Sequence, residues 1–165
     1  MSKTADFDLA AAHKYFAASC FNNAWDLIEK KERTDKDNQM MVVLSYASIF
    51  HWSNRPDCDE QKLSIGYWQA SRVQALIHNP HEAVRLGEIC LSYSHGLPPF
   101  FRAYAHEALA RAYELMGEQS QMERHLSAAL RFLALVKDEP NRDQLEADLT
   151  QLAQATKAGA AGPGD

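Results

Sequence analysis

The densest group of residues that could do chemistry lies between positions 51 and 68. It surrounds a polar loop at residues 54–59 and holds two of the chain's three tryptophans. The side chains that could bind a ligand here are His51, Trp52, Arg55, Tyr67 and Trp68. Functional residues favour loops that a rigid scaffold holds in place, so this segment is a candidate binding site. The sequence leaves open the alternative that these bulky rings only seal an irregular junction between helices.

A catalytic or metal-dependent use of the same segment has weaker support. If the chain is an enzyme, His51 with Asp57 or Asp59 is the first place to look. Cys58 is a poor nucleophile, because neighbouring carboxylates raise the pKa of a thiol. The chain has no G-x-S-x-G motif, glycine-rich phosphate loop or paired zinc-ligand pattern. We therefore predict no catalytic residue, no metal and no cofactor, and we favour binding over catalysis.

The elements that must position these residues are helices, because apolar residues recur at steps of three and four. We expect about eight helices, at residues 6–19, 21–28, 37–53, 59–77, 80–95, 98–117, 119–136 and 138–155. The turn signals are Asn79-Pro80, Pro98-Pro99, and glycines at 96 and 117, with a left-handed C-cap expected at Gly96. The fold class is all-α, with one domain over residues 1–156 and a disordered tail at 157–165.

A repeat is visible in the segment ALARAYELMGE at residues 108–118, which is followed by Leu126, Ala129 and Leu130. This pattern resembles a tetratricopeptide repeat, and weaker copies centre on residues 70–83 and 12–28. The segments at 51–58 and 63–69 are also similar to a group of uncharacterised bacterial tetratricopeptide-like proteins. The resemblance implies antiparallel hairpins that stack into a right-handed superhelix.

In that family the first helix of each hairpin lines a concave inner surface. The resemblance therefore places seven side chains on this surface: His13, Trp68, Arg72, Tyr104, Glu107, Arg111 and Glu114. The arginines could hold a carboxylate or phosphate by forked hydrogen bonds, and the two rings could form flat apolar walls. In the alternative interpretation, Glu107 pairs with Arg111 one helical turn further on, and the rings pack between hairpins.

Composition limits the partners and the location. The net charge is −5 and no block of basic residues occurs, so nucleic acid and anionic membranes are disfavoured. Three widely spaced cysteines make no disulfide framework, and this favours a reducing compartment. The sequence shows neither a signal peptide nor an apolar run long enough to cross a membrane. We expect a cytoplasmic protein.

Two hypotheses for the function follow. The first is a non-enzymatic binding or scaffold module, whose concave helical groove takes a protein or peptide, or a small anionic ligand. The second is a homodimer formed by pairing of the last helix. That helix carries an apolar stripe at Leu145, Leu149, Leu152 and Ala153.

Overall fold

The computed structural model describes residues 7–160, and this part of the chain folds entirely into helices and their connections, without a strand. The helices are α1 (Leu9–Ile28), α2 (Asp35–Ser53), α3 (Glu60–Leu76), α4 (Pro80–Ser94), α5 (Pro99–Met116), α6 (Gln119–Leu133) and α7 (Glu139–Ala160). The predicted all-helical class is therefore confirmed. None of these helices has both the length and the hydropathy that crossing a membrane requires.

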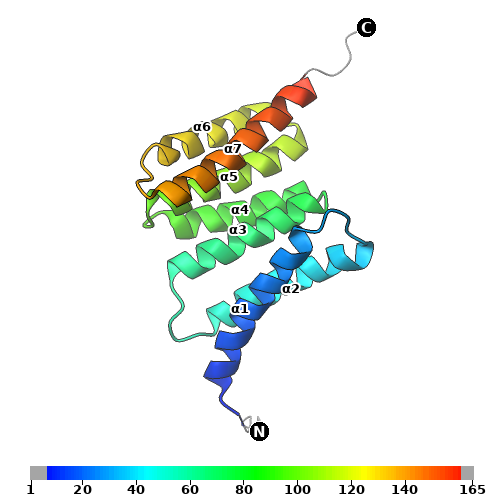
Figure 1. The fold of residues 1–165 in the computed structure, drawn as a ribbon, viewed down its shortest axis with the longest axis vertical. Coiled ribbons are helices and arrows are strands. Elements are labelled where there is room, and N and C mark those ends of the chain that lie inside the picture. The colour runs from blue at the N-terminus through cyan, green and yellow to red at the C-terminus, as the bar shows by residue number, and fades with distance from the viewer. Residues whose placement is uncertain (1–6, 161–165) are drawn as a thin grey trace.

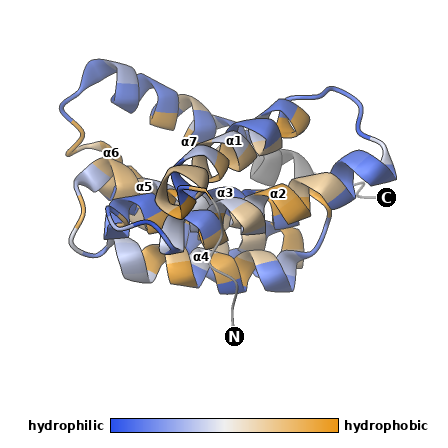
Figure 2. Ribbon diagram, turned by 90° about the horizontal axis from the view of Figure 1, so that it is seen from below, coloured by the Kyte–Doolittle hydropathy of each residue, from blue (hydrophilic) through white to orange (hydrophobic). Residues whose placement is uncertain are grey.

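Consecutive helices pack as hairpins, with α1 against α2, α3 against α4, and α5 against α6. The hairpins are stacked along the long axis of the molecule, with α1 and α2 at one end and α6 and α7 at the other (Figure 1). The first helices of successive hairpins also approach one another, since α3 contacts α5 and α5 contacts α7. Hydrophobic residues recur along the helices, while the long loops are mostly hydrophilic (Figure 2).

Small residues hold the stack together. Alanines with almost no exposed surface lie where helices touch, for instance Ala83 on α4 and Ala112 on α5, and they let the helix axes come close. Larger side chains fill the remaining space. The largest apolar side chains that are fully buried are Met41, Leu86, Leu109, Met122, Leu145, Leu149 and Leu152.

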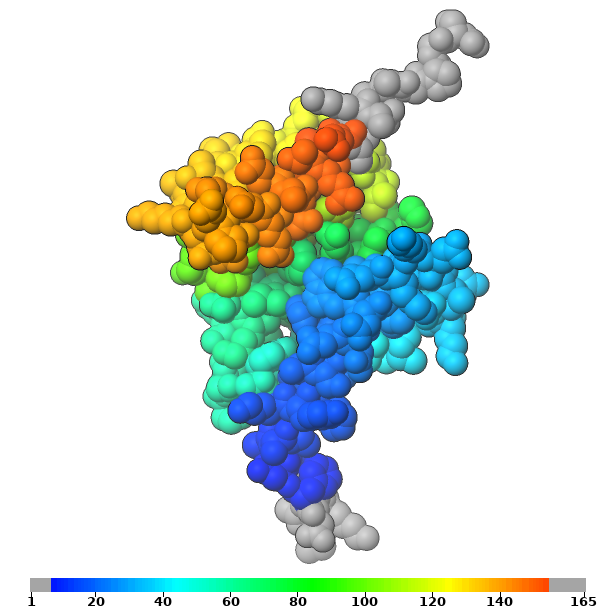
Figure 3. Space-filling view, viewed as in Figure 1, coloured from blue at the N-terminus to red at the C-terminus, as the bar shows by residue number. Residues whose placement is uncertain are grey.

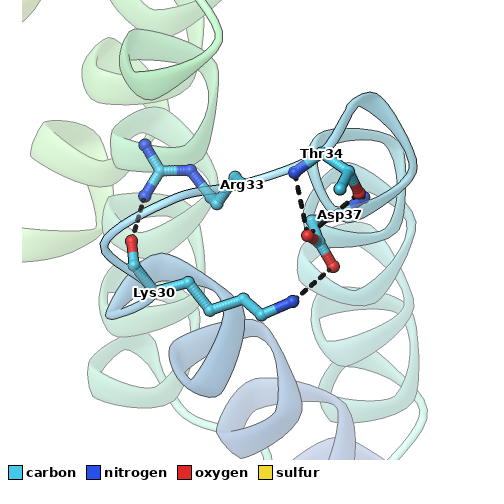
Figure 4. A network of polar contacts seen from close by, with 4 residues as sticks. All are labelled: Lys30, Arg33, Thr34 and Asp37. Carbon is cyan, nitrogen blue, oxygen red and sulfur yellow. Dashed lines mark hydrogen bonds and ion pairs between the residues drawn. The ribbon is translucent and has the colours of Figure 1, made fainter.

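The first break in the chain differs from the prediction. We expected one helix to end at Ser19 and another to follow, but α1 runs without interruption to Ile28, so the described residues hold seven helices. The other break expected here, in the charged stretch at residues 29–36, is confirmed: it is the loop before α2, which has its own polar contacts (Figure 4). Thr34 and Asp37 form a capping box at the start of α2, and the Lys30 ammonium lies 2.9 Å from the Asp37 carboxylate.

Three predicted helix signals are confirmed. Asp59 is the N-cap of α3, where its carboxylate accepts a hydrogen bond from the backbone N–H of Lys62 at 2.9 Å. Pro80 is the first residue of α4, a position where the missing N–H costs nothing. Gly117 ends α5 in the left-handed region, with φ of 71°.

The predicted left-handed cap at Gly96 is wrong. The chain leaves α4 through His95, which keeps right-handed helical angles, and Gly96 is not among the residues with positive φ. Among the described residues other than glycine, His78 alone takes a positive φ, of 58°. It lies in the short turn between α3 and α4, where the expected signal was Asn79-Pro80.

The C-terminal helix uses its apolar stripe inside the chain. Leu145 and Leu149 are buried with Ala103 and Ala129 of α5 and α6, and Leu152 is buried with Met122. The three leucines are therefore not free to pair with a second copy, as the dimer hypothesis required. The helix also continues to residue 160 through the start of the predicted tail, and residues 161–165 lie outside the described part of the chain.

Candidate functional site

The centre of the candidate site is the side chain of Glu107 on α5, of which only 1% is exposed. The indole Nε1 of Trp68 donates a hydrogen bond to its Oε2 at 3.1 Å, and Arg111 Nε donates to its Oε1 at 2.8 Å. The Arg72 guanidinium completes an ion pair at 3.8 Å. These four residues form what we call the Glu107 cluster.

Helical spacing explains why the cluster forms. Trp68 and Arg72 lie one turn apart on α3, and Glu107 and Arg111 lie one turn apart on α5, so each helix presents two of the side chains on one face. Contact between α3 and α5 brings these faces together. The pairing of Glu107 with Arg111, which the sequence left as an alternative interpretation, is present.

The charges in the Glu107 cluster are unevenly matched, because two guanidinium groups share one carboxylate. Burial disfavours the charge of Arg111, but the neighbouring carboxylates, Glu107 before Asp148 and Glu114, together hold the pKa of Arg111 above its ordinary value. Arg72 is less well satisfied. Its Nε and Nη1 atoms are buried without a hydrogen-bond partner.

Tyr104 connects this cluster to α7. Its hydroxyl donates a hydrogen bond of 2.7 Å to the carboxylate of Asp148, and its ring meets the ring of Trp68 edge-on at a centroid distance of 5.1 Å. Burial and the bond to Asp148 together raise the pKa of Tyr104 well above its usual range. The hydroxyl therefore remains a proton donor at any physiological pH.

A pocket of about 450 Å³ opens beside the cluster, and we call it the central pocket. It is bounded by α1, α3, α5 and α7, with one residue from α4, and aromatic side chains make up most of its wall. Its lining residues are Phe21, Trp25, Glu29, Ser64, Ile65, Trp68, Cys90, Phe100, Phe101, Tyr104 and Gln144. Its size is that of a small-molecule or side-chain binding site.

Two further pockets adjoin the central pocket. One, of about 330 Å³, shares Phe21 and Ile65 with it and extends to Trp52. The other, of about 620 Å³, shares Phe100 and Phe101 with it. We call this row of three neighbouring pockets the groove, and aromatic side chains line each of them. Figure 3 shows the face on which α1 (blue) and α7 (orange) flank the green surface between them.

The structure divides the predicted site residues into separate groups. Trp68 and Tyr104 line the central pocket, whereas Arg72, Glu107 and Arg111 lie next to it without lining it. The others form three separate pairs, His13 with His51, Trp52 with Arg55, and Tyr67 with Tyr93, and of these six residues only Trp52 lines one of the three pockets.

In each of these three pairs the two side chains are in contact with each other. The Nδ1 atoms of His13 and His51 are 2.9 Å apart, so α1 and α2 share a histidine pair. The Arg55 guanidinium lies over the ring of Trp52, 3.9 Å from its centroid. Tyr67 stacks on a tyrosine of α4 and packs with buried Ile49. The candidate segment at 51–68 is thus no single site.

The most important residues that the sequence missed are Phe21 and Trp25 on α1. They are one turn apart, their rings are 6.4 Å apart, and both line the central pocket. The prediction of a helix break at Ser19 concealed them, because it placed them in a separate short helix. Phe100 and Phe101 were missed too, although a pair of aromatic residues directly after Pro98-Pro99 was a visible signal.

The groups considered for catalysis have other partners. The Nδ1 atom of His51 pairs with His13, Asp57 binds the Arg55 guanidinium, and Asp59 caps α3. Burial, and after it the carboxylate of Asp59, raises the pKa of the Cys58 thiol, in the predicted direction. Within residues 7–160 no group of three metal-ligating side chains comes together.

Comparison with known proteins adds no family to this description. No protein-family model, no curated protein and no solved structure matches the chain.

Proposed function

We propose that this chain is a binding module, and that the groove bounded by α1, α3, α5 and α7 takes a peptide segment. The tetratricopeptide resemblance supports this proposal, since three of these helices, α1, α3 and α5, carry the side chains that it assigns to the inner surface of a right-handed superhelix. The hairpin packing of the helices is consistent with that arrangement.

The observation that carries the proposal is the continuity of the aromatic groove. A peptide presents side chains at regular intervals, and a row of adjoining apolar pockets can take several of them at once. The central pocket and its two neighbours share residues at both junctions, Phe21 and Ile65 on one side and Phe100 and Phe101 on the other. Large aromatic residues are typical of the anchor positions in interfaces.

A small anionic ligand has less support from the geometry than a peptide. The arginines that motivated it, Arg72 and Arg111, are both engaged by Glu107. An anion at this place would have to compete with a buried carboxylate that is already there. Only one observation favours an anion: the Nε and Nη1 atoms of Arg72 are buried without a hydrogen bond.

Intrinsic fluorescence offers a direct test, because all three tryptophans of the chain line the groove. A peptide that fills the groove will change their emission and will raise the unfolding temperature by mass action. Trp25→Leu should weaken binding. Tyr15→Leu is the matched control, since Tyr15 is an exposed aromatic residue of the same helix that lines none of these three pockets. A peptide library that leaves both signals unchanged contradicts the proposal.

Self-association is a second candidate function, and a different surface now favours it. Most of the large hydrophobic side chains that are exposed belong to the first hairpin and the residues before it. They are Phe7, Leu9, Tyr15, Phe16, Met40, Val43 and Phe50. In stacked hairpins a terminal face needs a polar cap, and this one is apolar. Size-exclusion chromatography with light scattering tests it: a dimer that Val43→Asp converts to a monomer supports the candidate, and a monomeric wild-type chain excludes it.

A further inference from the structure

The rings around the central pocket form an unbroken series across three helices. Phe21 meets Trp25, Trp25 meets Trp68 at 5.6 Å, Trp68 meets Tyr104, and Tyr104 meets Phe100 at 5.0 Å. Neighbouring planes are inclined to each other by 42° to 77°. The rings are inclined rather than stacked, and all five of them line the central pocket. The face of an aromatic ring carries a negative electrostatic potential, which attracts cations.

Two of these rings are polarised further in the same sense. Trp68 donates its indole N–H to the Glu107 carboxylate, and Tyr104 donates its hydroxyl to the Asp148 carboxylate. A hydrogen bond from a ring substituent to an anion shifts electron density toward the ring. The Tyr104 ring therefore becomes a better partner for a cation, whereas the Trp68 ring already has the Arg72 guanidinium over it, 5.9 Å from its centroid.

The charges at the pocket have the sign that suits a cation. Among the residues that line it, Glu29 carries the only charge, and its side chain is exposed. The nearest cations, Arg72 and Arg111, are held by Glu107 and do not line the pocket. Counting Asp148 as well, three carboxylates and two guanidinium groups surround the site, which gives 2 − 3 = −1.

From these observations we propose that the central pocket binds an alkylated ammonium group. Its methyl groups would contact the ring faces, and its charge would be balanced by the rings and by Glu29. A simple ammonium ion is a poorer fit, because it needs hydrogen-bond acceptors to replace its hydration shell. The same chemistry occurs in a free quaternary amine and in a methylated lysine of a peptide. In the second case the inference rests on the proposed function and names the side chain that anchors the peptide.

The deciding experiment compares choline with 3,3-dimethylbutan-1-ol, which has the same shape without the charge. Binding to the full-length protein is measured by tryptophan fluorescence and calorimetry. We expect choline to bind roughly three- to thirty-fold more tightly, the range of cation–π contributions. Equal affinities, tighter binding of the neutral alcohol or no binding of either compound would overturn the proposal. Preferential binding of benzoate would overturn it in favour of an anion site at Arg72.

Two variants test whether the preference for choline arises at the central pocket. Glu29→Gln should lower the affinity for choline several-fold and leave that for the neutral alcohol unchanged, because only the cation feels the carboxylate. Asp26→Asn is the matched control, since Asp26 is an exposed carboxylate on the same helix that does not line the pocket. Equal losses in both variants would mean that the total charge of the protein is responsible, and would contradict a local site.

A comparison of peptides distinguishes the two possible ligands, a free quaternary amine and a methylated lysine within a peptide. Three versions of one peptide are compared, with trimethyllysine, lysine or norleucine at a central position. Preference for trimethyllysine supports a methylated peptide, and binding of choline alone supports a free amine and contradicts the peptide function. If all three peptides bind equally, the groove binds peptides but the ammonium inference fails.

Discussion

Trp68 and Glu107 are 39 residues apart in the chain, yet the indole N–H of Trp68 donates a hydrogen bond of 3.1 Å to the Glu107 carboxylate. This bond joins the wall of the central pocket to the buried charge beside it. It also fixes the orientation of the Trp68 ring, which is in contact with rings on either side. The pocket and the Glu107 cluster are therefore one structural unit.

Removing the Glu107 carboxylate should destabilise the protein strongly. In Glu107→Leu, Arg72 and Arg111 lose their shared counter-charge while remaining largely buried, and we expect a loss of about 3–5 kcal/mol in the free energy of unfolding. Glu107→Gln should cost less, about 1–3 kcal/mol, because the amide oxygen still accepts from Trp68. Urea denaturation measures both. Glu118→Gln, an exposed site, is the control, and a Leu variant as stable as wild type would contradict the account.

Part of the Glu107 cluster and of the central pocket was predicted from the sequence. The family resemblance selected Trp68, Arg72, Tyr104, Glu107 and Arg111, and the structure brings these five side chains together. Spacing of one helical turn was enough to predict the pair of Glu107 with Arg111. The orientation of each side chain was not predictable, because it depends on how α3 and α5 pack. The prediction that the two arginines line the groove therefore failed, and both lie beside it.

The histidine pair of α5 and α6 should make stability depend on pH. The Nδ1 atoms of His106 and His125 are 3.0 Å apart, and burial, His125 and nearby arginines lower the pKa of His106 to about 4. Between pH 6.5 and 4 the unfolded chain therefore takes up a proton that the folded chain does not. Stability must fall as the pH falls through this window.

His106→Gln should flatten that dependence by up to about 1.4 kcal/mol per pH unit, the linkage value for one proton. The measurement is urea denaturation at a series of pH values between 7 and 4. His125 remains in the variant and its pKa is also lowered by burial and by Arg124, so a smaller slope should persist. His81→Gln, at an exposed position of α4, is the control variant.

Two turn residues should respond to substitution in opposite directions. Gly117 has φ of 71° and no atom within 4 Å of the position that a Cβ would occupy, so Gly117→Ala should cost about 1 kcal/mol through backbone strain alone. His78 has φ of 58° with a side chain present, so His78→Gly should gain about 0.5–1 kcal/mol. Thermal unfolding of both variants checks the signs. A stabilising Gly117→Ala would show that the left-handed turn is not populated.

The parts of the fold that the sequence did not predict have physical causes. The glycine at 96 looked like a cap because it follows a basic residue, but the chain could leave α4 through Pro98-Pro99 without a left-handed residue. The break expected at Ser19 belonged to the weak repeat copy at residues 12–28, whereas the next expected break, before α2, has a capping box at Thr34. A capping signal stabilises a helix start, because it satisfies backbone N–H groups that would otherwise be unpaired.

The last prediction concerns the leucine stripe of α7, whose use inside the chain bears on the oligomeric state. Leu149→Ala should lower the free energy of unfolding by about 2–5 kcal/mol, because it opens a cavity beside Ala103 and Ala129. Thr150→Ala, at the next and exposed position, should change it by less than about 0.5 kcal/mol. Both variants are unfolded in urea at two protein concentrations that differ by about a hundredfold. A stripe buried within one chain predicts a loss that is the same at both concentrations. If the loss grew on dilution, the leucines would be packing between two copies, since the stability of an interface depends on protomer concentration.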